Sequence, residues 1–169
     1  MISKRIKLLK KKFSEYNIDG YVVPKNDEFF SEYATQDRLK NISNFTGSAG
    51  LAIITQKRNL LFVDGRYTIQ AQEQSGKQFK IIKIHELLPH KIIKNITLGF
   101  DPSLFTYKQL NIYFKKSIKL KPINNNLIDE IYKSRKIKNK SFYSLNDKIV
   151  GESTKSKINK IVKILKKNK

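Results

Sequence analysis

Apolar residues recur at two different spacings along the chain, and the two spacings predict different elements. Near the N-terminus, Ile6, Leu9 and Phe13 lie on one face of an amphipathic helix over residues 2–16. Short β-prone runs follow at 21–23, 51–55, 60–63, 79–84, 96–100 and 118–122, with helical patterns at 67–75, 86–95, 106–114 and 127–132. Strands that alternate with helices predict an α/β fold, in which a sheet of about five or six strands is flanked by helices.

The C-terminal segment repeats the pattern of the first helix. Its apolar residues stand 152 residues after those of the first helix, at Ile158, Ile161 and Leu165. Residues 133–140 are basic and polar, which is typical of a linker. We therefore expect one α/β domain over residues 1–140, followed at 141–169 by a linker and the first helix of a truncated second domain.

Composition narrows the class of protein. Apolar residues make up 39% of the 169 positions, which indicates a buried core, and the absence of Cys excludes disulfides and thiolate chemistry. No apolar run approaches the roughly 20 residues that span a bilayer, so we expect a cytoplasmic protein without a membrane partner. The net charge of +21 comes mainly from Lys, with five Arg residues. Such a charge suits an acidic partner or nucleic acid, but phosphate and base recognition favours Arg, so the excess of Lys argues against nucleic acid as the main partner.

Small residues precede the 51–55 run at Gly47-Ser48-Ala49-Gly50. A dinucleotide fingerprint or a phosphate-binding loop has a different glycine spacing and comes between a strand and a helix, whereas this loop comes before a strand. The spacing of a nucleophile elbow also fails, because it needs Gly where Thr46 stands. We therefore interpret Gly47, Ser48 and Gly50 as a structural loop that permits a tight turn and close backbone approach.

Metal ligands are sparse. His85 and His90 are five residues apart, not the four that place two ligands on one helical face, and they are expected to be ordinary surface residues. Four acidic residues offer a carboxylate cluster for a hard cation, but helix capping and solvated charge explain them more simply. They are Asp27, Glu28, Glu32 and Asp37.

The polar group Asp64-Gly65-Arg66-Tyr67 interrupts an apolar strand where a helix begins. Asp64 is placed to accept hydrogen bonds from the first helical amides, or to pair with Arg66 or Arg38. The structural interpretation is a strand-to-helix junction held by a charged network. The functional alternative is that Arg66 or Arg38 points toward a substrate held by another domain.

Four stretches together resemble one family. In their order and spacing, these stretches are similar to the N-terminal domain of Xaa-Pro aminopeptidases (aminopeptidase P), in the creatinase/prolidase group. They are SEYATQDRLKNISNFTGSAGLAIIT, LLFVDGRYTIQAQEQ, LGFDPSLFT and NNNLIDEIY. The resemblance covers about residues 1–140 and implies an α/β domain with a mixed sheet and flanking helices. A second domain of similar fold in larger members would account for the helix that begins near Ser153.

The resemblance also implies where the chemistry lies. In the family, a C-terminal "pita-bread" domain cleaves the peptide bond before proline with two metal ions, usually manganese. We expect no cofactor in this chain, and no hydrolysis by it alone. The residues that match the family's N-terminal motifs are candidates for contact with a catalytic domain or for control of substrate access: Arg38, Asp64, Arg66 and Tyr67, with Gly47, Ser48 and Gly50 as the structural loop.

Three functional interpretations stay open at this point. The leading one is the non-catalytic N-terminal domain of a truncated or split Xaa-Pro aminopeptidase, with a pita-bread domain on a separate chain or a second copy of itself as partner. A second is a Lys-rich interaction module that binds an acidic partner or nucleic acid. The third is a non-functional gene remnant whose exposed apolar tail would favour self-association.

Overall fold

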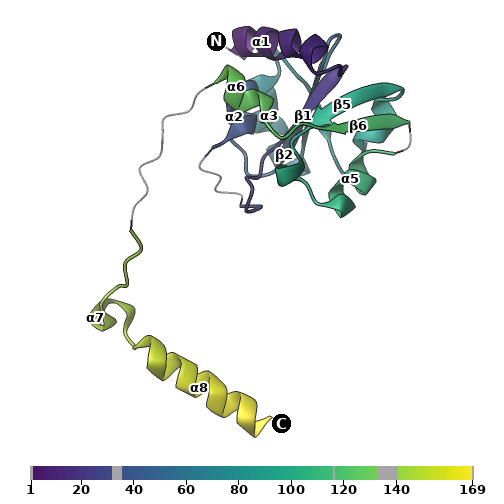
Figure 1. The fold of residues 1–169 in the computed structure, drawn as a ribbon. Helices are drawn as coiled ribbons and strands as arrows, with labels where there is room; N and C mark the ends of the chain where they lie inside the picture. Colours follow the sequence, from purple (N-terminus) through teal and green to yellow (C-terminus); the bar gives the residue numbers. More distant parts are fainter. Residues whose placement is uncertain (1, 32–35, 116, 133–140, 169) are drawn as a thin grey trace. The chain divides into compact units, whose positions relative to one another are not determined.

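A computed structural model describes residues 2–31, 36–115, 117–132 and 141–168. The chain divides into two compact units, Met1–Arg135 and Lys136–Lys169. The residues 133–140, predicted to be a linker, lie outside the described part of the chain, as does Glu32. The first unit contains the sheet, and the second contains two helices (Figure 1).

The first unit alternates strands and helices much as the sequence predicts. Its strands are β1 (Gly20–Pro24), β2 (Gly50–Thr55), β3 (Asn59–Val63), β4 (Lys80–Lys83), β5 (Ile96–Phe100) and β6 (Ile118–Pro122). Its α-helices are α1 (Ile2–Glu15), α2 (Arg38–Ser43), α3 (Thr68–Ser75), α4 (Pro89–Ile92), α5 (Tyr107–Tyr113) and α6 (Leu127–Ile131). Two short 3₁₀ turns, η1 (Gly65–Tyr67) and η2 (Pro102–Leu104), follow β3 and β5.

The six strands form one mixed sheet in the order β4-β3-β2-β1-β5-β6. Strand β2 is antiparallel to both of its neighbours, whereas β1 pairs in parallel with β5, β5 with β6, and β3 with β4. The expected α/β class with a mixed sheet and flanking helices is therefore confirmed. The sequence also favours a β2–β3 hairpin at the centre of the sheet. In the structure β2 is one of the two middle strands and β1 is the other, so the hairpin lies off-centre, with β3 next to the edge strand β4.

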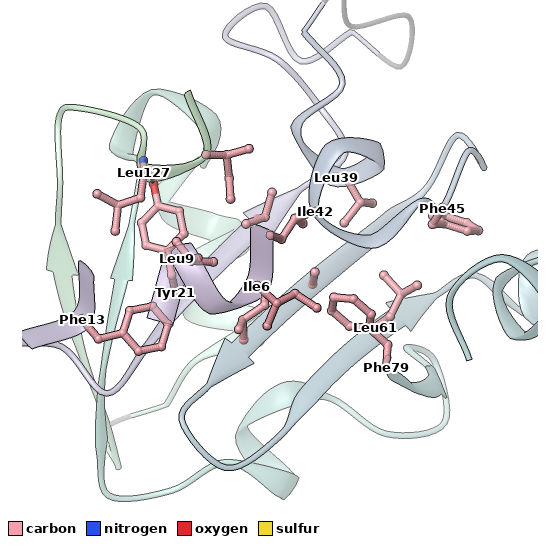
Figure 2. Packing of buried hydrophobic residues seen from close by; sticks show 14 of the residues in the cluster. Ile6, Leu9, Phe13, Tyr21, Leu39, Ile42, Phe45, Leu61, Phe79 and Leu127 are labelled. Carbon is pink, nitrogen blue, oxygen red and sulfur yellow. Dashed lines mark hydrogen bonds between the residues drawn. The ribbon is translucent and has the colours of Figure 1, made fainter. Parts of the chain in front are cut away.

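Alternation along the middle strands builds a core on each face of the sheet. On one face, Tyr21 and Leu61 belong to a cluster that α1, α2, α3 and α6 cover. Figure 2 shows Leu9 of α1 and Leu127 of α6 beside Tyr21, whose hydroxyl accepts a hydrogen bond from the Leu127 amide at 3.4 Å. Since side chains alternate between faces, the intervening residues point the other way.

The second cluster lies under α4, α5 and η2. It includes Ile53 of β2 and Phe62 of β3, and Phe105 and Phe114 from the segment around α5. Helix α5 begins with a capping box, in which Thr106 accepts from the Gln109 amide and the Gln109 side chain accepts from the Thr106 amide. The cap thus satisfies the amides of Thr106 and Gln109 and fixes where α5 begins.

Gly76, after α3, corrects one expectation. The sequence favours a left-handed C-cap there, but Gly76 has φ −58° and is right-handed. The chain instead continues through a turn, with the amides of Gln78 and Phe79 both donating to the Ser75 carbonyl. The carbonyls at the helix end are thus partly satisfied without a left-handed residue.

The second unit holds α7 (Asp147–Val150) and α8 (Thr154–Lys167). Ser153 caps α8 by accepting from the Ser156 amide. The helix contains no buried residue, although its apolar side chains share one face. Within the described residues, we find no helix that is both long enough and apolar enough to cross a membrane.

Candidate functional site

The four stretches that suggest a family converge at one edge of the sheet. Strands β1, β3, β5 and β6 all end there, and the reversed strand β2 begins there. We call this the motif edge, formed by residues 25–31, 44–49, 64–67, 101–106 and 123–126. The carboxyl edge of parallel strands is where α/β sheets usually bind ligands, because loops there are free to vary on a rigid frame.

The glycines before β2 allow an aromatic ring to pack beneath the loop. A Cβ atom on Gly47 would stand 2.2 Å from Cζ of Phe45, and one on Gly50 would stand 2.9 Å from Cδ2 of Leu39. Phe45 and Leu39 are fully buried. Close packing therefore requires small residues at Gly47 and Gly50.

Ser48 joins this loop to the turn after β3. The hydroxyl oxygens of Ser48 and Tyr67 are 2.7 Å apart, and the Tyr67 ring meets the Phe45 ring edge-on at 5.9 Å between centroids. The two most characteristic stretches of the sequence thus contact each other directly. Together they form a hydrogen-bonded, aromatic brace at the motif edge.

Asp64 and Arg66 make a second contact in the same turn. Asp64 Oδ1 accepts from the Arg66 amide at 3.0 Å and from Arg66 Nε at 2.9 Å. These two bonds hold the pKa of the Asp64 carboxyl below its ordinary value. Of the partners that the sequence suggests for Asp64, the structure therefore provides a first-turn amide and Arg66, whereas Arg38 lies in a different network.

Arg38 is buried at the start of α2 and is 5% exposed. Its guanidinium donates to Asp129 of α6 at 2.8–3.0 Å and to Glu28 Oε1 at 2.7 Å. Burial lowers the pKa of Arg38, but the bonds to Asp129 and Glu28 outweigh it and the net shift is upward. Arg38 therefore ties the loop after β1 to two helices, and it offers little surface of its own to another domain.

A cavity opens at the motif edge beside the brace. It has a volume of about 290 Å³ and lies between Lys25, Ser48, Asp64, Phe105 and Tyr113. We call it the edge pocket. The sequence pattern points to Ser48 and Asp64 but not to Lys25, Phe105 and Tyr113, because a lone lysine and separate aromatic residues carry no local signal of a shared cavity.

The described residues do not fit a metal centre. Among them, no group of three or more His, Cys, Asp or Glu side chains is close enough to hold an ion. Asp27 instead accepts from the amides of Phe29 and Ser31, and Asp37 caps α2 and pairs with Lys25. Of the acidic residues considered as a cluster, Glu32 lies outside the described part.

Comparisons with known proteins identify the family of this chain. Residues 5–136 match the family described as the creatinase/prolidase N-terminal domain. The chain is 33% identical over 187 residues to a probable Xaa-Pro aminopeptidase P of Coprinopsis cinerea, covering 99% of this chain and 29% of that protein. It is 30% identical over 189 residues to Xaa-Pro aminopeptidase 1 of Dictyostelium discoideum, covering 98% and 30%. The chain thus spans about 30% of the length of these curated relatives.

Solved structures share the fold. The X-prolyl aminopeptidase of Caenorhabditis elegans, described as a cytosolic enzyme with a di-nuclear active site, superposes with a TM-score of 0.73 at 24% identity, covering 99% of this chain and 31% of that one. An Xaa-Pro dipeptidase of Bacillus anthracis gives a TM-score of 0.61 at 25% identity, covering 78% and 36%. Since the family match includes the whole motif edge, the chain belongs to the creatinase/prolidase N-terminal domain family and is homologous to the N-terminal part of Xaa-Pro aminopeptidases.

Proposed function

We propose that this chain is the non-catalytic N-terminal domain of a cytoplasmic Xaa-Pro aminopeptidase, a proline-specific metallopeptidase. In this role its motif edge helps to assemble the enzyme or to control the access of peptides to a metal-containing pita-bread domain. The observation that carries the proposal is the convergence of all four family stretches at one edge of the sheet. The homology to Xaa-Pro aminopeptidases supports the reaction to which the domain contributes.

The rim of the motif edge suggests which residues meet the partner. Arg66 and Asp64 form an ion pair with side-chain exposures of 75% and 40%, so both groups are within reach of another domain. Arg66 Cζ lies 5.6 Å from the centre of the Tyr67 ring, and the Tyr67 hydroxyl contacts that of Ser48. We therefore assign Arg66 and Asp64 to the contact, and Tyr67, Ser48 and the glycines to its support.

The test is hydrolysis of an Xaa-Pro peptide in the presence of Mn²⁺. The purified chain is assayed alone and mixed with a pita-bread protein from the same source. We expect no hydrolysis by the chain alone and faster hydrolysis in the mixture than with the pita-bread protein alone. Hydrolysis by the chain alone, or a mixture no faster than the pita-bread protein, would contradict the proposal.

A matched pair of variants makes this test specific to the motif edge. Arg66→Glu should reduce the stimulation, because it places like charges beside Asp64 at the contact. Arg58→Glu makes the same charge change at the β2–β3 turn, at the opposite edge of the sheet, and should leave the stimulation intact. Equal losses in both variants would point to bulk charge instead of a specific contact.

The net charge of +21 favours one alternative, a module that binds an acidic partner or nucleic acid through its Lys-rich surface. Such binding would show as retention of nucleic acid on a native gel. If the retention survives near-physiological salt, the alternative gains support over the peptidase role. If it disappears as salt rises, the binding reflects counterion release by scattered lysines.

A further inference from the structure

The edge pocket has an apolar floor and an open mouth. Its floor includes Leu51, Phe62 and Phe105, which belong to the second core cluster and are almost fully buried. Its volume of about 290 Å³ is near the lower end of small-ligand sites. A cavity of this size fits one apolar side chain with part of the backbone that carries it.

Its charges cancel. Lys25 and Asp64 are the charged residues among those lining the pocket. Each is already paired, Lys25 with Asp37 and Asp64 with Arg66. In a chain with a net charge of +21, a locally neutral pocket does not suit a phosphate, a nucleic acid or a free carboxylate.

Two hydrogen-bond donors line the pocket from one helix. Gln109 and Tyr113 are four residues apart on α5 and therefore lie on the same helical face. The Gln109 side-chain oxygen is used by the capping box, which leaves its NH₂ group as the available donor. Within the described residues, neither this NH₂ group nor the Tyr113 hydroxyl has a hydrogen-bond partner, and burial raises the pKa of Tyr113 so that its hydroxyl stays protonated.

Phe30 forms part of the pocket wall in an unusual backbone conformation. It has φ +57°, a region that bulky residues rarely occupy, and its side chain is half-exposed. Asp27 maintains this turn by accepting from the amides of Phe29 and Ser31 through its side chain, and from Phe30 through its carbonyl. An aromatic ring held half-exposed at a pocket mouth provides a surface for an apolar ligand.

We propose that the edge pocket binds an extended, uncharged polypeptide segment, whose apolar side chain enters the pocket while its backbone carbonyls accept hydrogen bonds from Gln109 and Tyr113. Peptide carbonyls match the two donors, and the neutral lining favours a segment interior over a charged terminus. The inference goes beyond the proposed function, because it concerns binding by this chain alone and requires no catalytic domain.

The test is a titration of the isotope-labelled full chain with the blocked peptide acetyl-Ala-Leu-Ala-amide, followed by NMR. We expect saturable shifts at the amides around Lys25, Gly50 and Tyr113. N-acetyl-leucine, which carries the same side chain with a free carboxylate, should bind more weakly. Absence of saturable shifts, tighter binding of N-acetyl-leucine, or the same shifts on raising the protein concentration without peptide would overturn the inference.

Variants of α5 separate binding from folding. Tyr113→Phe removes the hydroxyl alone, and Gln109→Glu removes the NH₂ donor but keeps an oxygen for the capping box. Each should weaken the peptide affinity about fivefold, the usual effect of one hydrogen bond. Tyr107→Phe, which changes an exposed hydroxyl on the same helix outside the pocket, should have no effect.

Phe30→Gly gives an independent readout. Glycine adopts a positive φ without strain, so this variant should melt no lower than the natural chain. It also removes the aromatic wall, so its peptide affinity should fall. Unchanged affinity in Phe30→Gly, Tyr113→Phe and Gln109→Glu would refute the assignment of the pocket.

Discussion

Helices α1 and α8 have the same length and nearly the same apolar pattern, but different surroundings. Each has 14 residues. Ile6, Leu9 and Phe13 of α1 are at most 5% exposed, whereas their counterparts in α8 are more than half exposed: Ile158 at 54%, Ile161 at 57% and Leu165 at 62%. The same periodicity therefore leads to a core in one unit and to an exposed stripe in the other.

The difference lies in long-range partners. Helix α1 packs on α2, α6 and the middle strands, so its apolar face is removed from water (Figure 2). Within the described part of its own unit, α8 is accompanied only by the four-residue helix α7. An amphipathic sequence thus specifies which face a helix can bury, but a second element must be present to bury it.

The largest effect should come from truncating a core residue of α1. Leu9 is fully buried, so Leu9→Ala leaves a cavity and should lower the free energy of unfolding of the first unit by about 3 kcal/mol. Ile161→Ala, a comparable truncation on α8, should change it by less than about 0.5 kcal/mol. Urea unfolding followed by tyrosine fluorescence measures both. A large loss of unfolding free energy in Ile161→Ala would show that α8 is packed in solution, and would contradict the difference between the two helices.

The ion pairs of the two units should differ in the same way as the two helices, with the buried pair of the first unit contributing more to the free energy of unfolding. Arg38→Ala removes the buried cation between Asp129 and Glu28, and should cost about 2 kcal/mol, because those carboxylates remain partly exposed. Lys160→Ala breaks the pair with Glu152 in the second unit, at 2.7 Å but with the lysine 67% exposed, and should cost less than about 0.5 kcal/mol. Unfolding midpoints in urea provide the comparison, and similar losses would mean that burial does not govern these pairs.

Local patterns predict elements well because their causes are local. Strand β5 occupies the predicted residues 96–100, and α5 lies within the helical pattern predicted at 106–114. The partners of Arg38 were not foreseen, because Asp129 lies 91 residues away in the sequence. Pairing of that kind depends on how α2 and α6 meet over the sheet.

The sequence predicts only part of the candidate site, because only some of its residues carry a local signal. The sequence pointed to Ser48, Asp64 and Tyr67, and all three lie at the motif edge. It gave no signal for Gln109 and Tyr113, because a polar and an aromatic residue four apart resemble any exposed helix face. Only the tertiary fold brings these residues of α5 to the same cavity as Leu51 of β2 and Phe62 of β3.

A smaller effect should come from the hydrogen bond that braces the motif edge. Ser48→Ala and Tyr67→Phe each remove the contact between the two hydroxyls, and each should cost about 1 kcal/mol. The double variant should cost little more than either single one, since both remove the same bond. Ser153→Ala removes a local cap of α8, and should leave the unfolding of the first unit unchanged. Additive losses in the double variant would show that the two hydroxyls act separately.

The smallest expected effect is a pH dependence in the contact between α1 and α6. Glu130 accepts from Tyr16 at 2.9 Å and pairs with Lys12 at 3.0 Å. Burial raises the pKa of the Glu130 carboxyl, but the bonds from Lys12 and Tyr16 outweigh it, so the net pKa lies below the ordinary value of 4.5. A depressed pKa means that this contact stabilises the folded unit above pH 4.5 and is lost as the pH falls below it.

Glu130→Gln should therefore reduce the loss of stability between about pH 5 and pH 3, by less than about 1 kcal/mol. The matched control is Glu152→Gln in the second unit, where bonds from Lys160 and Ser156 also lower the pKa of the carboxyl. Because Glu152 contacts only its own unit in the described part of the chain, its variant should leave the pH dependence of the first unit unchanged. Urea midpoints at several pH values would separate the two. If Glu152→Gln also flattens the profile, the two units are coupled in solution, and the exposure of α8 is not an independent property of its sequence.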